Sequence, residues 1–135
     1  MSHISQGRGK IAFTDKNLLL KALEKVGRVE ESTHLYVETG GGGHSRTMTK
    51  YDVVLISQTN KKHRIGFNKN SDGHYVPFEE NWGDCGRWTR RVKPMLDDLY
   101  IGYHYEQQMQ NEGFDVELVM NDDGTIEVEG VEQVW

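Results

Sequence analysis

Tyr51-Asp52-Val53-Val54-Leu55-Ile56 is the stretch that decides the fold, because apolar side chains fill almost all of it. Successive side chains of a strand point to opposite faces of a sheet, so a run that is apolar on both faces indicates a strand covered on both sides. We therefore expect residues 51–56 to form a central strand with other strands beside it.

Shorter strand patterns flank this central strand. Residues 33–38 alternate apolar and polar side chains, which is typical of a half-buried strand. Residues 63–67 and 74–78 are joined by a polar connection ending in Gly73, which favours a hairpin. A first strand is expected within residues 3–13.

Residues 16–26 are predicted to form the first helix. Its apolar side chains recur at steps of three and four residues, as one helix face requires: Leu19, Ala22, Leu23 and Val26. Thr14 or Asp15 is expected to cap the start, because a side-chain oxygen there accepts a hydrogen bond from a first-turn N–H. Gly27 follows the last apolar residue, the usual place for a left-handed helix stop.

A second, longer helix is predicted to end at Gly113. We expect it to begin near Thr89 or Lys93, and Pro94 favours the later start because proline lacks an N–H and is tolerated in a first turn. Residues 81–87 are then expected to form a loop. The apolar face of this helix carries Val92, Leu96, Leu99 and Tyr103.

The chain closes with a predicted hairpin that has one apolar and one acidic face. Residues 114–120 and 126–129 alternate apolar with acidic side chains, and residues 121–124 form the turn between them. The acidic face carries Asp115, Glu117, Glu127 and Glu129, with Glu132 beyond them. A solvated face that discourages aggregation or meets a basic partner is the favoured interpretation, and a cation site the lesser one.

These elements predict an α+β fold in a single domain over residues 1–135. The order is strand, helix, three or four strands, long helix and two strands. That order favours a mostly antiparallel sheet with two helices packed on one face, akin to the ferredoxin-like or split βαβ sandwich.

Composition excludes several classes of protein. A net charge of −5 and a pI near 5.6 argue against a surface built throughout to bind nucleic acid, although a local basic patch is compatible with them. A single cysteine, Cys85, permits no disulfide within the chain. We find no targeting segment and no apolar run of membrane-spanning length, so we expect a soluble, intracellular protein.

Short blocks recur in one order along the chain and resemble a known family. They are Met1-Ser2-His3-Ile4, Asp15 with Leu19 and Ala22-Leu23, Tyr51-Asp52-Val53, Val92 with Leu96-Asp97, Leu99 and Tyr103, Gly113-Phe114-Asp115-Val116, and Gly124-Thr125-Ile126. The family is the plastid hypothetical reading frame thirty-five family, or domain of unknown function twelve fifty-seven, of bacteria, cyanobacteria and algal plastids. It has no established reaction. The resemblance implies a location in the plastid stroma or the bacterial cytoplasm, and a role beside ATPases of the AAA+ kind.

One basic and aromatic cluster precedes and enters the predicted second helix. It contains Arg87, Trp88, Arg90, Arg91 and Lys93. Such a cluster can hold a phosphate or another anion near a helix N-terminus, dock a partner, or let the tryptophan stack on a base. The structural alternative is that the arginine stems pack on aromatic rings and their charges pair with neighbouring carboxylates.

The six histidines show no spacing typical of a metal site. His63 and His74 could face each other across their hairpin with Asp72 nearby, and His34 and His44 could approach across the glycine loop. We predict surface histidines and no cofactor, with His63, His74 and Asp72 as the weak metal candidates.

Two further features favour structural over catalytic roles. Residues 40–43 are four glycines, but no Gly-Lys-Ser/Thr follows, so a mobile hairpin loop is favoured over a phosphate cradle. Cys85 lies between Asp84 and Gly86 without an identifiable base, which favours an incidental thiol.

No catalytic constellation emerges, so we predict a protein that is more plausibly a binding module than an enzyme. The leading hypothesis is a protein-binding or adaptor module, with Trp135 as a further candidate contact because tryptophan often anchors interfaces. By analogy alone the partner is an AAA+ ATPase. The alternatives are nucleic-acid or nucleotide binding through residues 87–93, and a metal-assisted enzyme. Exposed strand edges leave a homodimer open.

Overall fold

A computed structural model describes residues 4–7 and 11–132 of the chain. In chain order its elements are β1 (Ile4–Gln6), α1 (Lys16–Val26), β2 (Arg28–Gly40), β3 (Gly43–Ile56), β4 (Arg64–Lys69), β5 (Tyr75–Glu80), α2 (Gly83–Asn111), β6 (Phe114–Met120) and β7 (Ile126–Glu132). The α+β class is confirmed. Within the described residues, no helix has the length and apolar character needed to cross a membrane.

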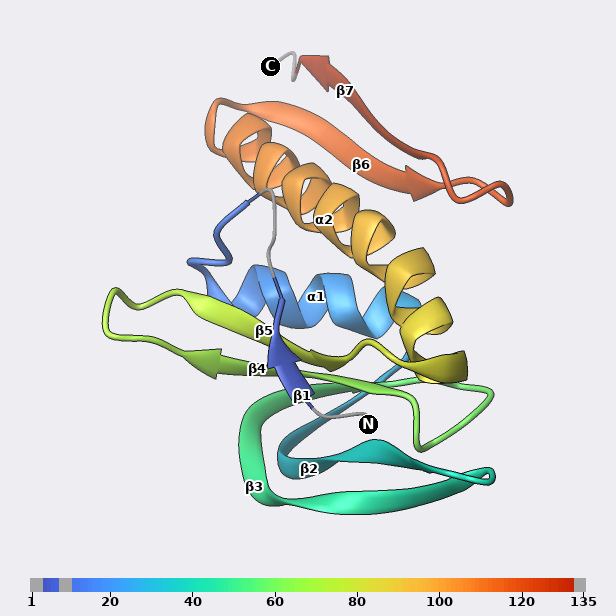
Figure 1. Ribbon diagram of the computed structural model, residues 1–135. Coiled ribbons are helices and arrows are strands. Elements are labelled where there is room, and N and C mark those ends of the chain that lie inside the picture. The colour runs from blue at the N-terminus through green and yellow to red at the C-terminus, as the bar shows by residue number, and fades with distance from the viewer. Residues whose placement is uncertain (1–3, 8–10, 133–135) are drawn as a thin grey trace.

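Five strands form an antiparallel sheet in the order β1-β5-β4-β3-β2. The two helices cover one face of this sheet, as predicted, and α2 crosses over α1 (Figure 1). The last two strands, β6 and β7, pair only with each other in a separate hairpin. This hairpin lies on the far side of α2 from the sheet, so α2 is covered on both sides (Figure 1).

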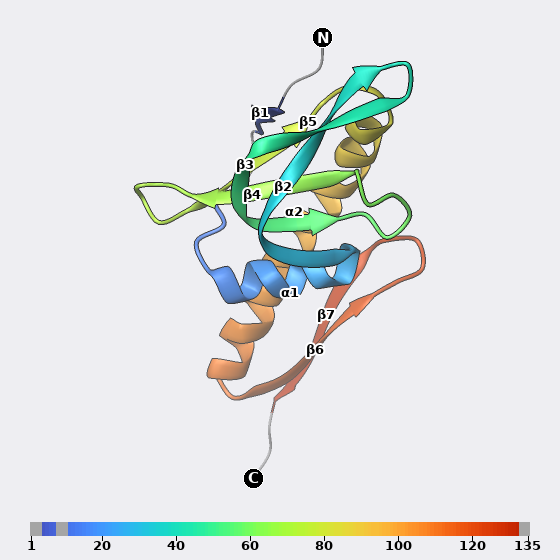
Figure 2. The same ribbon diagram turned by 90° about the horizontal axis from the view of Figure 1, so that it is seen from below.

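The central strand is buried on both faces, which confirms the prediction for residues 51–56. Val53 and Leu55 point into the main core beneath the helices, while Val54 and Ile56 point into a second core on the opposite face. That second core exists because the long ribbon of β2 and β3 curls around, as Figure 2 shows, and brings Leu35 over the back of the sheet.

The main core joins the helices to the sheet through aromatic contacts. The Phe13 ring packs edge-on against Phe67 of β4 and Tyr100 of α2, with centroids 5.8 and 5.0 Å apart. The Tyr100 hydroxyl also accepts hydrogen bonds from the backbone N–H groups of Thr14 and Asp15, each at 3.0 Å. These bonds hold the start of α1 against the middle of α2.

The first helix has the predicted bounds and the predicted cap. Asp15 Oδ1 accepts hydrogen bonds from Asn17 N at 2.9 Å and Leu18 N at 3.2 Å. The left-handed stop expected at Gly27 is wrong, because that residue is extended with φ −169°. A glycine is needed there for another reason: a Cβ atom would lie 2.5 Å from the carbonyl oxygen of Ile56.

The second helix begins earlier than predicted. α2 starts at Gly83, so residues 83–87, expected in a loop, are helical. Pro94 consequently lies inside the helix, where it removes one backbone hydrogen bond. Burial of Cys85 and Trp88, only 1% and 6% exposed, helps to offset that loss, because apolar side chains in the early turns gain from leaving water.

Two carboxylates from other strands support the start of α2. Cys85 N–H donates to Glu38 Oε1 at 3.4 Å, and Trp82 N–H donates to Glu80 Oε1 at 3.1 Å. Glu80 is fully buried and also accepts the N–H of Glu38 at 3.2 Å. Helix N-termini favour negative charge, so these contacts, one local and one from β2, replace the side-chain cap that Trp82 does not provide.

Candidate functional site

The predicted basic cluster lies on the first three turns of α2, where Arg90 and Lys93 line one pocket together with carboxylates such as Glu79. The Arg87, Arg90 and Arg91 side chains are exposed, whereas Lys93 is half-buried. Trp88 lies in the main core, so its ring cannot stack on a base in this conformation.

Much of the cluster's charge is engaged within the protein. Arg87 pairs with Asp84, and the Arg90 guanidinium donates to the Asn81 carbonyl at 3.2 Å. Lys93 Nζ lies 2.7 Å from Glu79 Oε1 in a pair that is 19% and 6% exposed. The structural alternative for the cluster is therefore well supported by its contacts.

The pairing of strands separates the histidines that were expected to meet. Ile65 pairs with Glu79 and Lys69 with Tyr75 along β4 and β5, so His63 and the turn holding Asp72 and His74 lie at opposite ends of the hairpin. The expectation that His63 and His74 face each other is wrong.

Across the glycine loop, His44 has Glu38 as its partner in place of His34. His34 pairs with Lys50, and Glu38 pairs with His44, so the expected approach of His34 to His44 is wrong. His63 instead lies beside Glu38 and His44, with one donor atom of each within 4.8 Å of the others. Glu38 and His44 could have been paired from sequence, since they flank the glycine turn, but nothing local points to His63.

Burial governs the titration of two side chains near this cluster. It lowers the pKa of His63, an effect that the Glu38 charge opposes, and so favours the neutral ring. Burial raises the pKa of the Cys85 thiol, which keeps it protonated and weakly nucleophilic. Cys85 thus has the environment of a core side chain.

The terminal hairpin has the predicted acidic outer face. Asp115, Glu117, Glu127 and Glu129 are all exposed. Glu117 lies directly opposite Glu129 in the register, and like charges in that position destabilise a strand pair. The side chain of Glu132 and all of Trp135 lie outside what the structure describes.

Acidic charge extends from the hairpin along the second half of α2. Residues 97–132 contain eleven Asp or Glu residues and no Lys or Arg, so all 16 basic residues of the chain lie elsewhere. The sequence alone shows this separation of acidic from basic residues, and the acidic segment is longer than the hairpin. Residues 97–132 therefore carry a strong negative net charge, and Lys21 of α1 lies beside them, 3.8 Å from Glu106.

A groove with apolar walls runs between α2 and β7 within this acidic region. Its volume is about 530 Å³, and the helix contributes Ile101 and Tyr105 while the strand contributes Ile126 and Val128. Ile101 is 50% exposed and Tyr105 48%. Exposed apolar side chains grouped in this way are typical of interaction surfaces.

Gly102 lets the hairpin approach the helix at the floor of this groove. A Cβ atom there would lie 2.5 Å from Leu118 Cδ1. The Glu106 carboxylate also accepts the backbone N–H of Leu118 at 3.0 Å. The groove is therefore a built feature of the contact between α2 and the hairpin. The helical periodicity of the sequence did not single out Ile101 or Tyr105, because this pair lies off the apolar stripe of Val92, Leu96, Leu99 and Tyr103.

No family model, curated protein or solved structure matches the chain.

Proposed function

We propose that this protein is a non-enzymatic protein-binding module whose docking face is the acidic end of the molecule. We define this docking face as the second half of α2 with the β6–β7 hairpin, residues 97–132. The observation that carries the proposal is the coincidence of an exposed apolar groove with a segment that contains eleven Asp or Glu residues and no Lys or Arg.

The chemistry of the docking face indicates the chemistry of the partner. Charge complementarity steers association and rejects partners of the wrong sign, while buried apolar anchors supply most of the affinity. A basic segment with apolar side chains on one side satisfies both requirements. Its apolar side chains would contact Ile101 and Tyr105, and its cations would relieve the repulsion between Glu117 and Glu129. An adaptor for an AAA+ ATPase, as the family resemblance implies, is one form of this function.

The test is affinity capture from the native host with matched variants. We expect the wild-type protein to recover a specific partner at low salt, and the partner to carry a basic segment. The variants Ile101→Ser/Tyr105→Ser and Glu117→Lys/Glu129→Lys should lose it, and raised salt should slow its binding. The control Arg87→Glu/Arg91→Glu changes exposed charges at the other end of α2 and should keep it.

Two results of the same experiment would count against the docking face. Recovery of the same proteins by the docking-face variants would contradict the proposal. Loss of the partner, or of bound nucleic acid, from the Arg87→Glu/Arg91→Glu variant alone would assign binding to the basic cluster instead.

A further inference from the structure

Three potential metal ligands meet near the N-terminus of α2, at the opposite end of that helix from the docking face. They are Glu38 of β2, His44 of β3 and His63 of the loop before β4, with donor atoms that all lie within 4.8 Å of one another. Glu38 and His44 are direct cross-strand partners, and all three residues are half-buried. Two imidazoles and a carboxylate are a ligand set that zinc and related divalent ions use.

One histidine nitrogen of this cluster, His44 Nε2, is buried without a hydrogen-bond partner among the described residues. A buried nitrogen left unpaired is costly, and coordination of an ion would remove that cost. His63 Nε2 lies 3.3 Å from the amide nitrogen of Asn60, a contact that positions the ring beside Glu38 and His44.

The start of α2 holds the carboxylate of Glu38 in place. Its Oε1 accepts the N–H of Cys85 at 3.4 Å, and its side chain lies against Gly83, where a Cβ atom would be only 1.9 Å from Oε2. Gly83 has φ +59°, a conformation that favours glycine. A hydrogen bond to a ligating carboxylate is typical of the outer shell of a metal site.

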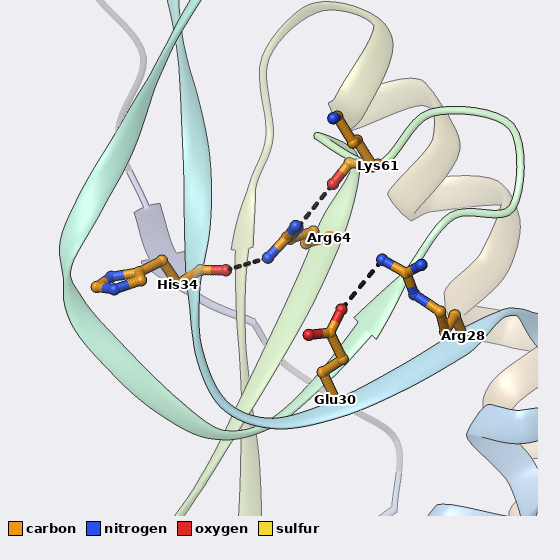
Figure 3. Close-up of polar contacts among 5 residues, drawn as sticks. All are labelled: Arg28, Glu30, His34, Lys61 and Arg64. Carbon is orange, nitrogen blue, oxygen red and sulfur yellow. Dashed lines mark hydrogen bonds and ion pairs between the residues drawn. The ribbon is translucent and has the colours of Figure 1, made fainter.

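The loop that carries His63 is fixed against the strand that carries Glu38. Arg64 makes this connection: its guanidinium donates to the carbonyl of His34 in β2 at 3.0 Å and to that of Lys61 in the loop at 2.7 Å (Figure 3). The His63 backbone adds bonds to Ser57 and Asn60, each at 2.9 Å. The ligands are therefore brought together by rigid contacts, which lowers the ordering cost of binding.

The three side chains are close to one another, yet within residues 4–7 and 11–132 no hydrogen bond or ion pair joins Glu38 to either histidine. Metal bonds of about 2.0–2.2 Å would draw the donors inward by a modest movement of the side chains. The histidine spacing in the sequence predicted no such site, since its ligands come from three separate segments.

We propose that Glu38, His44 and His63 bind one divalent transition-metal ion of the zinc type. Three protein ligands leave a further position open to water or to a donor from outside the chain. The ion would tie the tip of the β2–β3 ribbon to the β4 loop and to the start of α2. This inference is independent of the docking face and stands if that proposal fails.

The test measures zinc binding by untagged protein that has been stripped with a chelator. We expect one zinc ion per chain by calorimetry, and Co²⁺ in its place should give the visible absorption of a nitrogen- and oxygen-coordinated ion. Zinc should also raise the melting temperature, because an ion that binds the folded state stabilises it.

Matched variants identify the ligands. Glu38→Gln, His44→Ala and His63→Ala should each weaken zinc binding by more than about tenfold. The controls His34→Ala and His74→Ala should bind zinc as the wild type does. Melting curves without metal confirm folding, and Gln at position 38 keeps an oxygen for the Cys85 N–H.

Two outcomes would overturn the inference. One is the absence of stoichiometric zinc and cobalt binding by the folded wild-type protein. The other is binding that survives the three ligand substitutions, or that is lost in the His34 or His74 control.

Discussion

The curled sheet and the terminal hairpin are held in place in different ways. The sheet has a core on each face, and its central strand contributes Val53 and Leu55 to one and Val54 and Ile56 to the other. The hairpin has two strands and packs only one face against α2, with its outer face acidic and exposed. Because the sheet is packed on both faces and the hairpin on one, we expect the hairpin to be the less stable of the two regions.

A substitution in the main core should have the largest effect on the free energy of unfolding. Phe67→Ala removes a fully buried ring that packs on Phe13 in the main core. We expect a loss of about 3–5 kcal/mol in the free energy of unfolding, because the substitution leaves a cavity among packed side chains. Urea denaturation measures it, and a loss below about 1 kcal/mol would contradict the assigned core.

A substitution at the contact between α2 and the hairpin should have a smaller and more local effect. Gly102→Val places a branched side chain where a Cβ atom already lies 2.5 Å from Leu118 Cδ1. We expect overpacking to cost about 1–3 kcal/mol.

Hydrogen exchange can locate this second effect. Amides of β6 should exchange faster in Gly102→Val while those of β3 stay protected, because the hairpin can open without the sheet. Ile101→Val, at an exposed position of the same helix, is the control. Equal acceleration in β3 and β6 would show that the two regions unfold together.

Relief of charge repulsion should stabilise the hairpin slightly. Glu129→Lys places a cation opposite Glu117 and should gain about 0.2–1 kcal/mol at low salt. Glu129→Gln should gain less, and the gain of Glu129→Lys should shrink as salt screens the charges. Thermal unfolding and β6 hydrogen exchange measure it, and destabilisation by Glu129→Lys would indicate that the acidic face has an internal partner.

The smallest expected effect is confined to the hairpin turn. Hydrogen bonds from the Thr125 hydroxyl and N–H, at 2.6 and 3.0 Å, lower the pKa of Asp123. A depressed carboxyl pKa adds stability above the ordinary pKa and loses it as the pH falls through the depressed value. Thr125→Val should raise the pKa of Asp123 towards its ordinary value, measured by an NMR pH titration. An unchanged pKa would contradict the turn geometry.

Sequence patterns located most elements because their signals are local. The apolar stripe of α1 and the cap at Asp15 depend on residues within one or two turns, and the bounds of that helix were predicted correctly. The start of α2 was predicted too late. Part of its support comes from Glu38, a carboxylate on a distant strand that no local rule connects to Gly83.

The candidate sites show the same division. The acidic hairpin face followed from alternation of side chains along two strands, and the structure displays it. The basic cluster was visible, but the burial of Trp88 and the pairing of Lys93 with Glu79 were not. The groove at Ile101 and Tyr105 exists only because the hairpin packs beside them.

The order of helices and strands, the α+β class and the concentration of acidic charge over residues 97–132 were determined by the sequence itself, because periodicity and composition are properties of neighbouring residues. Only the tertiary structure decided that the hairpin would leave the sheet to cover α2, and that Glu38, His44 and His63 would meet. Both outcomes depend on which distant surfaces pack together, and no pattern of neighbouring residues records that choice.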